Sequence, residues 1–179
     1  MKEVLNGLNV KRLREFIEKV KSGVESGEKK LKVDGTWTSE GGAPHFRVNL
    51  KTPNDVGVYT IEFDEPESMG GEGKAPNPNQ VCLAGSIACY ALTFSKWAAL
   101  REIEIKGFTI EASTQVNLKK SLGVSDEPVV EEIEWTVFVD TDAGQEELQG
   151  LRRIADERCP GVYCLTNALK LSTKVVKRN

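Results

Sequence analysis

Hydrophobic and polar residues alternate along the chain with two different periods, and these periods predict its helices and strands. Residues 9–22 repeat apolar positions at helical spacing, with Asn9 as a cap. A second amphipathic helix is expected at 145–157, and a short helical turn begins at Pro160. Strand-like alternation recurs in six segments: 31–38, 46–52, 57–64, 108–119, 129–140 and 168–176. Strands and helices segregated in this way predict an α+β fold rather than a parallel βαβ sheet.

The segment 77–100 follows neither period because it is apolar on almost every face. Asn77 and Pro78 fit the cap and the first position of a helix. A helix that is hydrophobic all round is surrounded by protein or by lipid. The apolar run at 81–94 is shorter than the roughly 20 residues of a membrane span. We therefore expect a buried central helix.

Composition limits the classes of protein to which the chain can belong. With 179 residues and 39% hydrophobic content, it can bury one substantial core. A formal net charge of −3 argues against a nucleic acid or an anionic membrane as a partner. The N-terminus has no apolar stretch of signal-peptide length. We expect a cytoplasmic protein, in which cysteines are catalytic, metal-binding or inert rather than joined in structural disulfides.

The four cysteines provide the candidate reactive chemistry. Cys82 and Cys89 are seven residues apart in one helix, about 10 Å along its axis, whereas a disulfide needs Cα atoms within about 7 Å. Cys159 and Cys164 point in different directions across a helical turn. Any disulfide must therefore join the two segments. Cys159 precedes Pro160 and is a candidate helix cap, where free N–H groups favour the thiolate.

Each cysteine also has an unreactive interpretation. Buried cysteine is a common small hydrophobe, so Cys82 and Cys89 also fit an inert core. The cysteine spacing does not match a structural zinc site, and no metal or cofactor is expected. His45 is the only histidine, which excludes histidine-based triads and multi-histidine metal sites. The glycines at 70–73 lack a nucleotide-binding pattern, so a plain loop is expected there.

Three short motifs together resemble the OsmC/Ohr family of thiol peroxidases. They are Asn77-Pro-x-Gln80, Ala84-Gly85-x-x-Ala88-Cys89 and Cys159-Pro160. The stretch from Phe63 to Pro66, followed by Gly70-Gly71, resembles the loop that leads into that family's central helix. The expected order of elements is similar as well, and the resemblance covers about residues 31–176. We therefore expect an N-terminal helical extension and linker at 1–30 and an OsmC-like domain at 31–179.

The resemblance implies antiparallel sheets wrapped around a buried central helix in an intertwined homodimer. It also implies reduction of organic hydroperoxides, as in defence against oxidative stress. By matching position, Cys89 is the peroxidatic cysteine and Cys159 the resolving cysteine, and an external dithiol or thiol-bearing reductant resets the pair. In the hydroperoxide-reducing branch, an arginine from an early strand pairs with a glutamate ten residues before the peroxidatic cysteine. Arg47 is the arginine available here, and Asn79 stands in the place of the glutamate.

Asn79 keeps a second function open, because an amide cannot anchor the ion pair that activates the thiolate. We expect either a slow peroxidase for bulky organic hydroperoxides or an OsmC-like binding or sulfur-handling protein without efficient peroxidase activity. A structural dimer with inert cysteines is a third alternative. We expect Cys89 and Cys159 within disulfide reach, with Cys89 the less exposed. Apolar residues around Cys89 would provide a pocket: Leu83, Ile87, Tyr90, Phe94 and Trp97.

Overall fold

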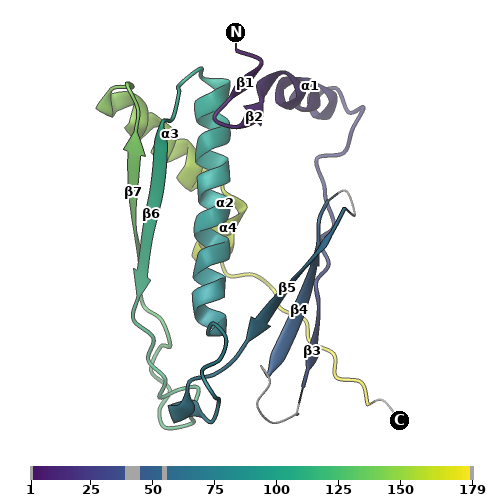
Figure 1. Cartoon of the computed structure of the whole chain (residues 1–179), viewed down its shortest axis with the longest axis vertical. Helices are drawn as coiled ribbons and strands as arrows, with labels where there is room; N and C mark the ends of the chain where they lie inside the picture. Colours follow the sequence, from purple (N-terminus) through teal and green to yellow (C-terminus); the bar gives the residue numbers. More distant parts are fainter. Residues whose placement is uncertain (1, 39–44, 54–55, 178–179) are drawn as a thin grey trace. The chain divides into compact units, whose positions relative to one another are not determined.

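The chain divides into two compact units in a computed structural model that describes residues 2–38, 45–53 and 56–177. One unit contains Met1–Leu13 and Ser86–Asn179, and the other contains Arg14–Gly85. The long helix α2 (Pro78–Leu100) begins in the second of these units and ends in the first (Figure 1). This division does not test the expected boundary at residue 30, which stays a prediction.

The unit Arg14–Gly85 contains a three-stranded antiparallel sheet. Its elements are β3 (Asp34–Trp37), β4 (Phe46–Lys51) and β5 (Val58–Phe63), followed by the short 3₁₀ helix η1 (Glu67–Met69). Strand pairing puts Trp37, Phe46 and Phe63 in one row. The next row contains Arg47 and Glu62. Because successive residues point to opposite faces of a sheet, one face is apolar and the other polar.

A buried carboxylate organises the loop between β5 and α2. Asp64 is 3% exposed and accepts hydrogen bonds from the N–H groups of Glu65, Glu72 and Lys74. These bonds hold the pKa of Asp64 below its usual value, and the bond from the Lys74 N–H has the largest effect. A Cβ on Gly71 would lie 1.9 Å from the Glu65 carbonyl oxygen, so only glycine fits there. The loop therefore closes around an internal carboxylate.

The other unit combines two hairpins with helical segments. Its elements are β1 (Val4–Leu5), β2 (Leu8–Asn9), the start of α1 (Val10–Lys21), most of α2, β6 (Gly107–Thr114), β7 (Ile133–Asp140), α3 (Gln145–Arg158) and α4 (Pro160–Thr166). Residues alternate along β7, with Trp135 and Val137 half-buried between exposed neighbours. The inward side chains pack against a core cluster that includes Phe94 on α2 and Leu151 on α3.

Burial of α2 is confined to its C-terminal half. Its buried residues are Tyr90, Thr93, Phe94, Ala98 and Ala99. Leu92, by contrast, is 62% exposed. Among the described residues, α2 is the one helix long and apolar enough to cross a membrane, a test that core helices of soluble proteins also pass. The packing of Tyr90 and Phe94 with β6, β7 and α3 gives α2 the place of a core helix in this unit.

The helices predicted from the sequence are confirmed together with their caps. Asn9 Oδ1 accepts the Arg12 N–H at 2.8 Å at the start of α1. Asn77 Oδ1 accepts the Asn79 N–H at 2.9 Å at the start of α2. Short polar side chains satisfy backbone donors that the first helical turn leaves without partners. The preference of asparagine for the N-cap position therefore predicted both helix starts correctly.

The strand predicted at 168–176 is wrong for this chain. Residues 168–177 pair with no strand among the described residues. Leu171 is 88% exposed and Val175 is 93% exposed. The apolar alternation of this segment marks one face, but a strand also needs a neighbour for its N–H and C=O groups. For the same reason β6 ends at Thr114, where its pairing with β7 ends, and not at residue 119.

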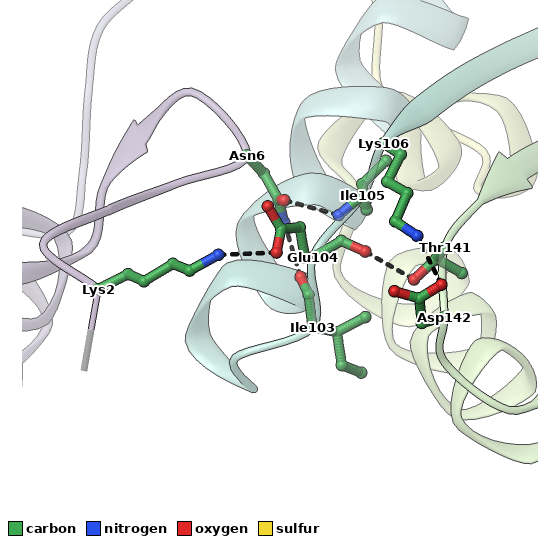
Figure 2. Close-up of polar contacts among 8 residues, drawn as sticks. All are labelled: Lys2, Asn6, Ile103, Glu104, Ile105, Lys106, Thr141 and Asp142. Atoms are coloured by element: carbon green, nitrogen blue, oxygen red, sulfur yellow. Dashed lines mark hydrogen bonds and ion pairs between the residues drawn. The ribbon is translucent and has the colours of Figure 1, made fainter.

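One side chain fastens the N-terminal hairpin to the turn after α2 (Figure 2). Asn6 lies at the hairpin tip with a φ of 53°. Its Nδ2 donates to the Ile103 carbonyl at 2.9 Å, and its Oδ1 accepts the Ile105 N–H at 2.8 Å. Lys2 adds an exposed ion pair to Glu104 at 2.7 Å. The hairpin was not among the predicted elements, although Asn-Gly is a frequent hairpin turn.

We predict that replacing Asn6 destabilises the protein. Asn6→Gly keeps the left-handed backbone and loses both hydrogen bonds, so the free energy of unfolding should fall by about 2 kcal/mol. Asn6→Ala should cost about 1 kcal/mol more, because alanine disfavours the positive φ. Denaturant unfolding followed by circular dichroism measures both values. Wild-type midpoints in both variants would show that this contact contributes nothing.

Candidate thiol site

Two elements bring the predicted reactive cysteines together. Cys89 lies near the middle of α2. Cys159 is the junction residue that ends α3 and precedes α4, with an extended backbone that lets Pro160 begin the next helix. The two thiols lie close enough that Cys159 acts on the ionisation of Cys89, and both are free. The predicted position of Cys159 as a cap residue is therefore confirmed, although its sulfur makes no capping hydrogen bond within the described chain.

The order of burial is the opposite of the one predicted. Cys159 is 1% exposed and belongs to the core cluster with Leu151 and Ala155. Cys89 is only half-buried. The prediction that Cys89 is the less exposed thiol is wrong, because other elements cover just part of α2 whereas the end of α3 lies in the core. Cys89 is therefore the more exposed of the two thiols.

Gly161 lies close to both thiols. A Cβ at this position would lie 3.1 Å from the Cys89 Cβ, 3.3 Å from the Ser86 carbonyl oxygen and 3.5 Å from the Cys159 Sγ. The first two distances are shorter than ordinary carbon contacts. The backbone N–H of Gly161 is close enough to the Cys89 sulfur to lower the pKa of this thiol. The first turn of α4 thus lies directly against α2.

The pKa of the Cys89 thiol is raised above its usual value. Burial is the main cause, and the adjacent Cys159 adds to the rise. The Gly161 N–H and, more weakly, the Lys96 ammonium group favour the thiolate and act in the opposite direction. Within this unit, Cys89 is therefore a thiol with partial stabilisation of its anion rather than a strongly activated thiolate.

Aromatic and charged side chains hold the elements around the pair. The Arg158 guanidinium lies 5.1 Å from the centre of the Trp97 ring, so its charge is engaged with an aromatic face. Tyr90 donates to Asp156 at 3.0 Å and links α2 to α3. Asp156 also pairs with Arg152 at 2.9 Å. These contacts fix the end of α3, and with it Cys159, against α2.

Part of the predicted apolar pocket is present, but it does not reach the thiols. A hollow of about 720 Å³ lies between β6, β7, α2 and α3. Tyr90 and Phe94 line it together with Trp135 and Phe108. Neither Cys89 nor Cys159 is among its lining residues. The other predicted pocket residues, Leu83, Ile87 and Trp97, do not line it either.

Arg47 belongs to the other unit, so neither unit by itself brings it together with Cys89. On the polar face of its sheet, Arg47 Nε donates to Glu62 Oε1 at 2.8 Å. Both residues line a polar hollow of about 640 Å³ with Asn49 and three threonines. The catalytic role predicted for Arg47 stays a prediction. Asn79 and Cys82 are exposed in the first turns of α2, and Cys164 is exposed on α4.

Two polar residues near the sheet were missed by residue-type reasoning. His45 Nδ1 lies 2.5 Å from Asp64 Oδ1, and its ring stacks on Trp37 with centroids 5.2 Å apart. The pair lies beside the loop that precedes α2. A lone histidine excludes triads but indicates no partner, and no spacing in the sequence links His45 to Asp64. Gly161 was missed for a similar reason, because its importance depends on helix packing.

The comparisons with known proteins agree with this architecture. The family model described as OsmC-like protein matches residues 71–174, more than half of the chain. The search of curated proteins found no match. Solved structures share the fold: an OsmC-like protein from Mycoplasma pneumoniae is 16% identical over 77% of this chain and 88% of its own, with a TM-score of 0.57.

Two further structures share the fold at similarly low identity. An organic hydroperoxide resistance protein OsmC from Legionella pneumophila is 19% identical over 78% of this chain and 92% of its own, with a TM-score of 0.53. An OsmC-like protein of unknown function from Vibrio cholerae is 12% identical over 78% of this chain and 95% of its own, with a TM-score of 0.58. The fold is therefore α+β with small antiparallel sheets, and the chain belongs to the OsmC-like protein family.

Proposed function

We propose that the protein is a thiol-dependent peroxidase that reduces organic hydroperoxides through Cys89 and Cys159. The observation that carries the proposal is the proximity of these two free thiols on either side of Gly161, one half-buried and one in the core. Membership of the OsmC-like family supports it. So does the similarity to a protein named for organic hydroperoxide resistance, which the low identity limits to the fold.

The proposed reaction begins at the more accessible sulfur. The Cys89 thiolate attacks the outer oxygen of the hydroperoxide, the O–O bond breaks, and the alkoxide takes a proton from water to leave as an alcohol. Cys89 is then a sulfenic acid. The Cys159 thiol attacks its sulfur, a disulfide forms, and the hydroxyl leaves as water. A dithiol reductant next exchanges with the disulfide, restores both thiols and leaves as its own disulfide.

Burial decides which sulfur the reductant attacks. Thiol–disulfide exchange requires the incoming thiolate to reach one sulfur along the S–S bond. Cys159 is 1% exposed, whereas Cys89 is half-buried. The reductant therefore attacks Cys89, and Cys159 leaves as the thiol. Cys89 is the point of contact with both the peroxide and the reductant.

A homodimer is part of the proposal, because a single chain leaves large apolar surfaces uncovered. Leu92 on α2 is 62% exposed, and on the apolar side of the sheet Trp37 is 64% exposed. The apolar C-terminal segment at 168–177 has no strand partner among the described residues. A second copy presents complementary surfaces of the same kind. A catalytic role for Arg47 is also part of this proposal. So is a cytoplasmic location.

One feature favours a second candidate, an OsmC-like binding or sulfur-handling protein. The pKa of Cys89 is raised by burial, and Asn79 supplies no carboxylate to anchor an activating arginine. A weakly activated thiol reacts slowly with peroxides, since the thiolate is the nucleophile. The same pair of thiols could then exchange sulfur species with a partner without efficient peroxide turnover.

We predict dithiol-dependent consumption of cumene hydroperoxide in preference to hydrogen peroxide. Cys89→Ser should abolish turnover, because sulfur is the nucleophile. Cys159→Ser should permit one stoichiometric oxidation and block recycling. Cys82→Ser with Cys164→Ser serves as a control that should keep wild-type turnover, since both residues are exposed and outside the pair. The measurement is peroxide loss with dithiothreitol as reductant.

The two candidate functions separate in that assay. Wild-type peroxide loss no faster than that of Cys89→Ser would exclude the peroxidase and leave the binding or sulfur-handling function. We expect a slow enzyme. Asn79→Glu should raise the rate only if Arg47 or another cation reaches the new carboxylate, so this variant reports on the missing activation.

We also predict that the protein is a dimer in solution. Burial of the exposed apolar faces on α2 and on the sheet drives the association. Multi-angle light scattering at micromolar concentration should give twice the chain mass of 19.7 kDa. A mass of one chain under these conditions would contradict this prediction and leave the exposed faces unexplained.

A further inference from the structure

We propose that Gly161 is a positioning residue for Cys89: its lack of a side chain lets α4 lie against α2, so that its backbone N–H reaches the Cys89 sulfur. This inference rests on the proposed function in one respect only, the use of Cys89 as a nucleophile. The contact itself is a property of the packing, and it can be measured without any peroxide.

The packing leaves little room for a larger residue at position 161. The position of a Cβ on Gly161 would be 3.1 Å from the Cys89 Cβ and 3.3 Å from the Ser86 carbonyl oxygen. Both of these atoms sit on the rigid helix α2 and cannot turn away as the end of a long side chain would. A methyl group must therefore move the start of α4 by several tenths of an ångström. Glycine is required by this approach and not by its backbone angles, since Gly161 is not among the glycines with positive φ.

Few groups act on the charge of Cys89. Lys96, on the same helix, favours the thiolate, and Cys159, between α3 and α4, disfavours it through its own sulfur. The Gly161 N–H is the neutral donor in this set, and it has the largest influence among the groups that favour the anion. A hydrogen bond to an anion is stronger and shorter than one between neutral groups, so it strengthens when the thiolate forms.

The contact lies in a short segment that also carries the second thiol. Gly161 is next to Pro160, so the same short segment carries the resolving Cys159 and the donor for Cys89. A shift of this segment would lower the reactivity of one thiol and misplace the other.

The test is the pH dependence of Cys89 alkylation by iodoacetamide, followed by mass spectrometry. It is made in a Cys82→Ser, Cys164→Ser background, in which Cys89 is the one remaining cysteine of its tryptic peptide. Gly161→Ala should raise the apparent pKa of Cys89 by about one unit and slow alkylation at neutral pH on the order of tenfold. The rate at high pH, where the thiolate is fully formed, should match the parent protein.

Gly85→Ala is the matched control for the same substitution. Gly85 lies one helical turn before Cys89 on α2, and a Cβ there would meet no atom within 4 Å. Its alkylation profile should overlay that of the parent protein. A purely structural role for Gly161 would lower the stability of Gly161→Ala but leave the pH profile of Cys89 unchanged, and that result would overturn the proposal.

A second measurement needs no substitution at Gly161 and remains informative if Gly161→Ala does not fold. In protein labelled with ¹⁵N-glycine, the Gly161 amide signal should shift with the same apparent pKa that alkylation gives for Cys89. In Cys89→Ser that titration should disappear. A Gly161 signal that stays constant through the ionisation of Cys89 would refute the hydrogen bond. Both measurements stand apart from peroxidase activity, so an inactive protein could still confirm or refute this contact.

Discussion

The close packing of the first turn of α4 on α2 is the constraint on which the candidate site depends. It is possible because glycine follows Pro160, and it brings a backbone donor and two thiols into one small volume. The Tyr90–Asp156 bond and the core side chains of α3 hold the other end of this arrangement. In the proposed reaction Cys159 is both a core residue and a reactant, so its reactivity cannot be separated from the stability of the unit around it.

The same packing gives the two thiols unequal exposure. Cys89 stands on a helix that is covered on one side, so it is accessible but partly desolvated, and burial raises its pKa. Cys159 is enclosed, with 1% of its surface exposed. A disulfide between them would leave one sulfur open to an external thiol. The exposed remainder of α2 and the apolar face of the sheet are the surfaces that the proposed dimer would cover.

The sequence predicted local features well and long-range ones poorly. Asn9 and Asn77 located helix starts because capping depends on neighbours within three residues. The strand expected at 168–176 failed because alternation carries no information about a pairing partner. The motifs singled out Cys89 and Cys159, but not which of them is buried, since burial follows from how α3 meets α2. The role of Gly161 could not be predicted for the same reason, because no neighbouring residue in the sequence indicates that this position packs closely on α2.

The central claim is that Cys89 and Cys159 form one redox pair. Its most direct test is to treat the reduced protein with one equivalent of cumene hydroperoxide and map the crosslinks by peptide mass spectrometry under non-reducing conditions. The account predicts a disulfide between Cys89 and Cys159 within a single chain, formed without loss of fold. Crosslinks that omit Cys89, or a Cys89 that stays reduced while Cys82 or Cys164 is oxidised, would contradict it.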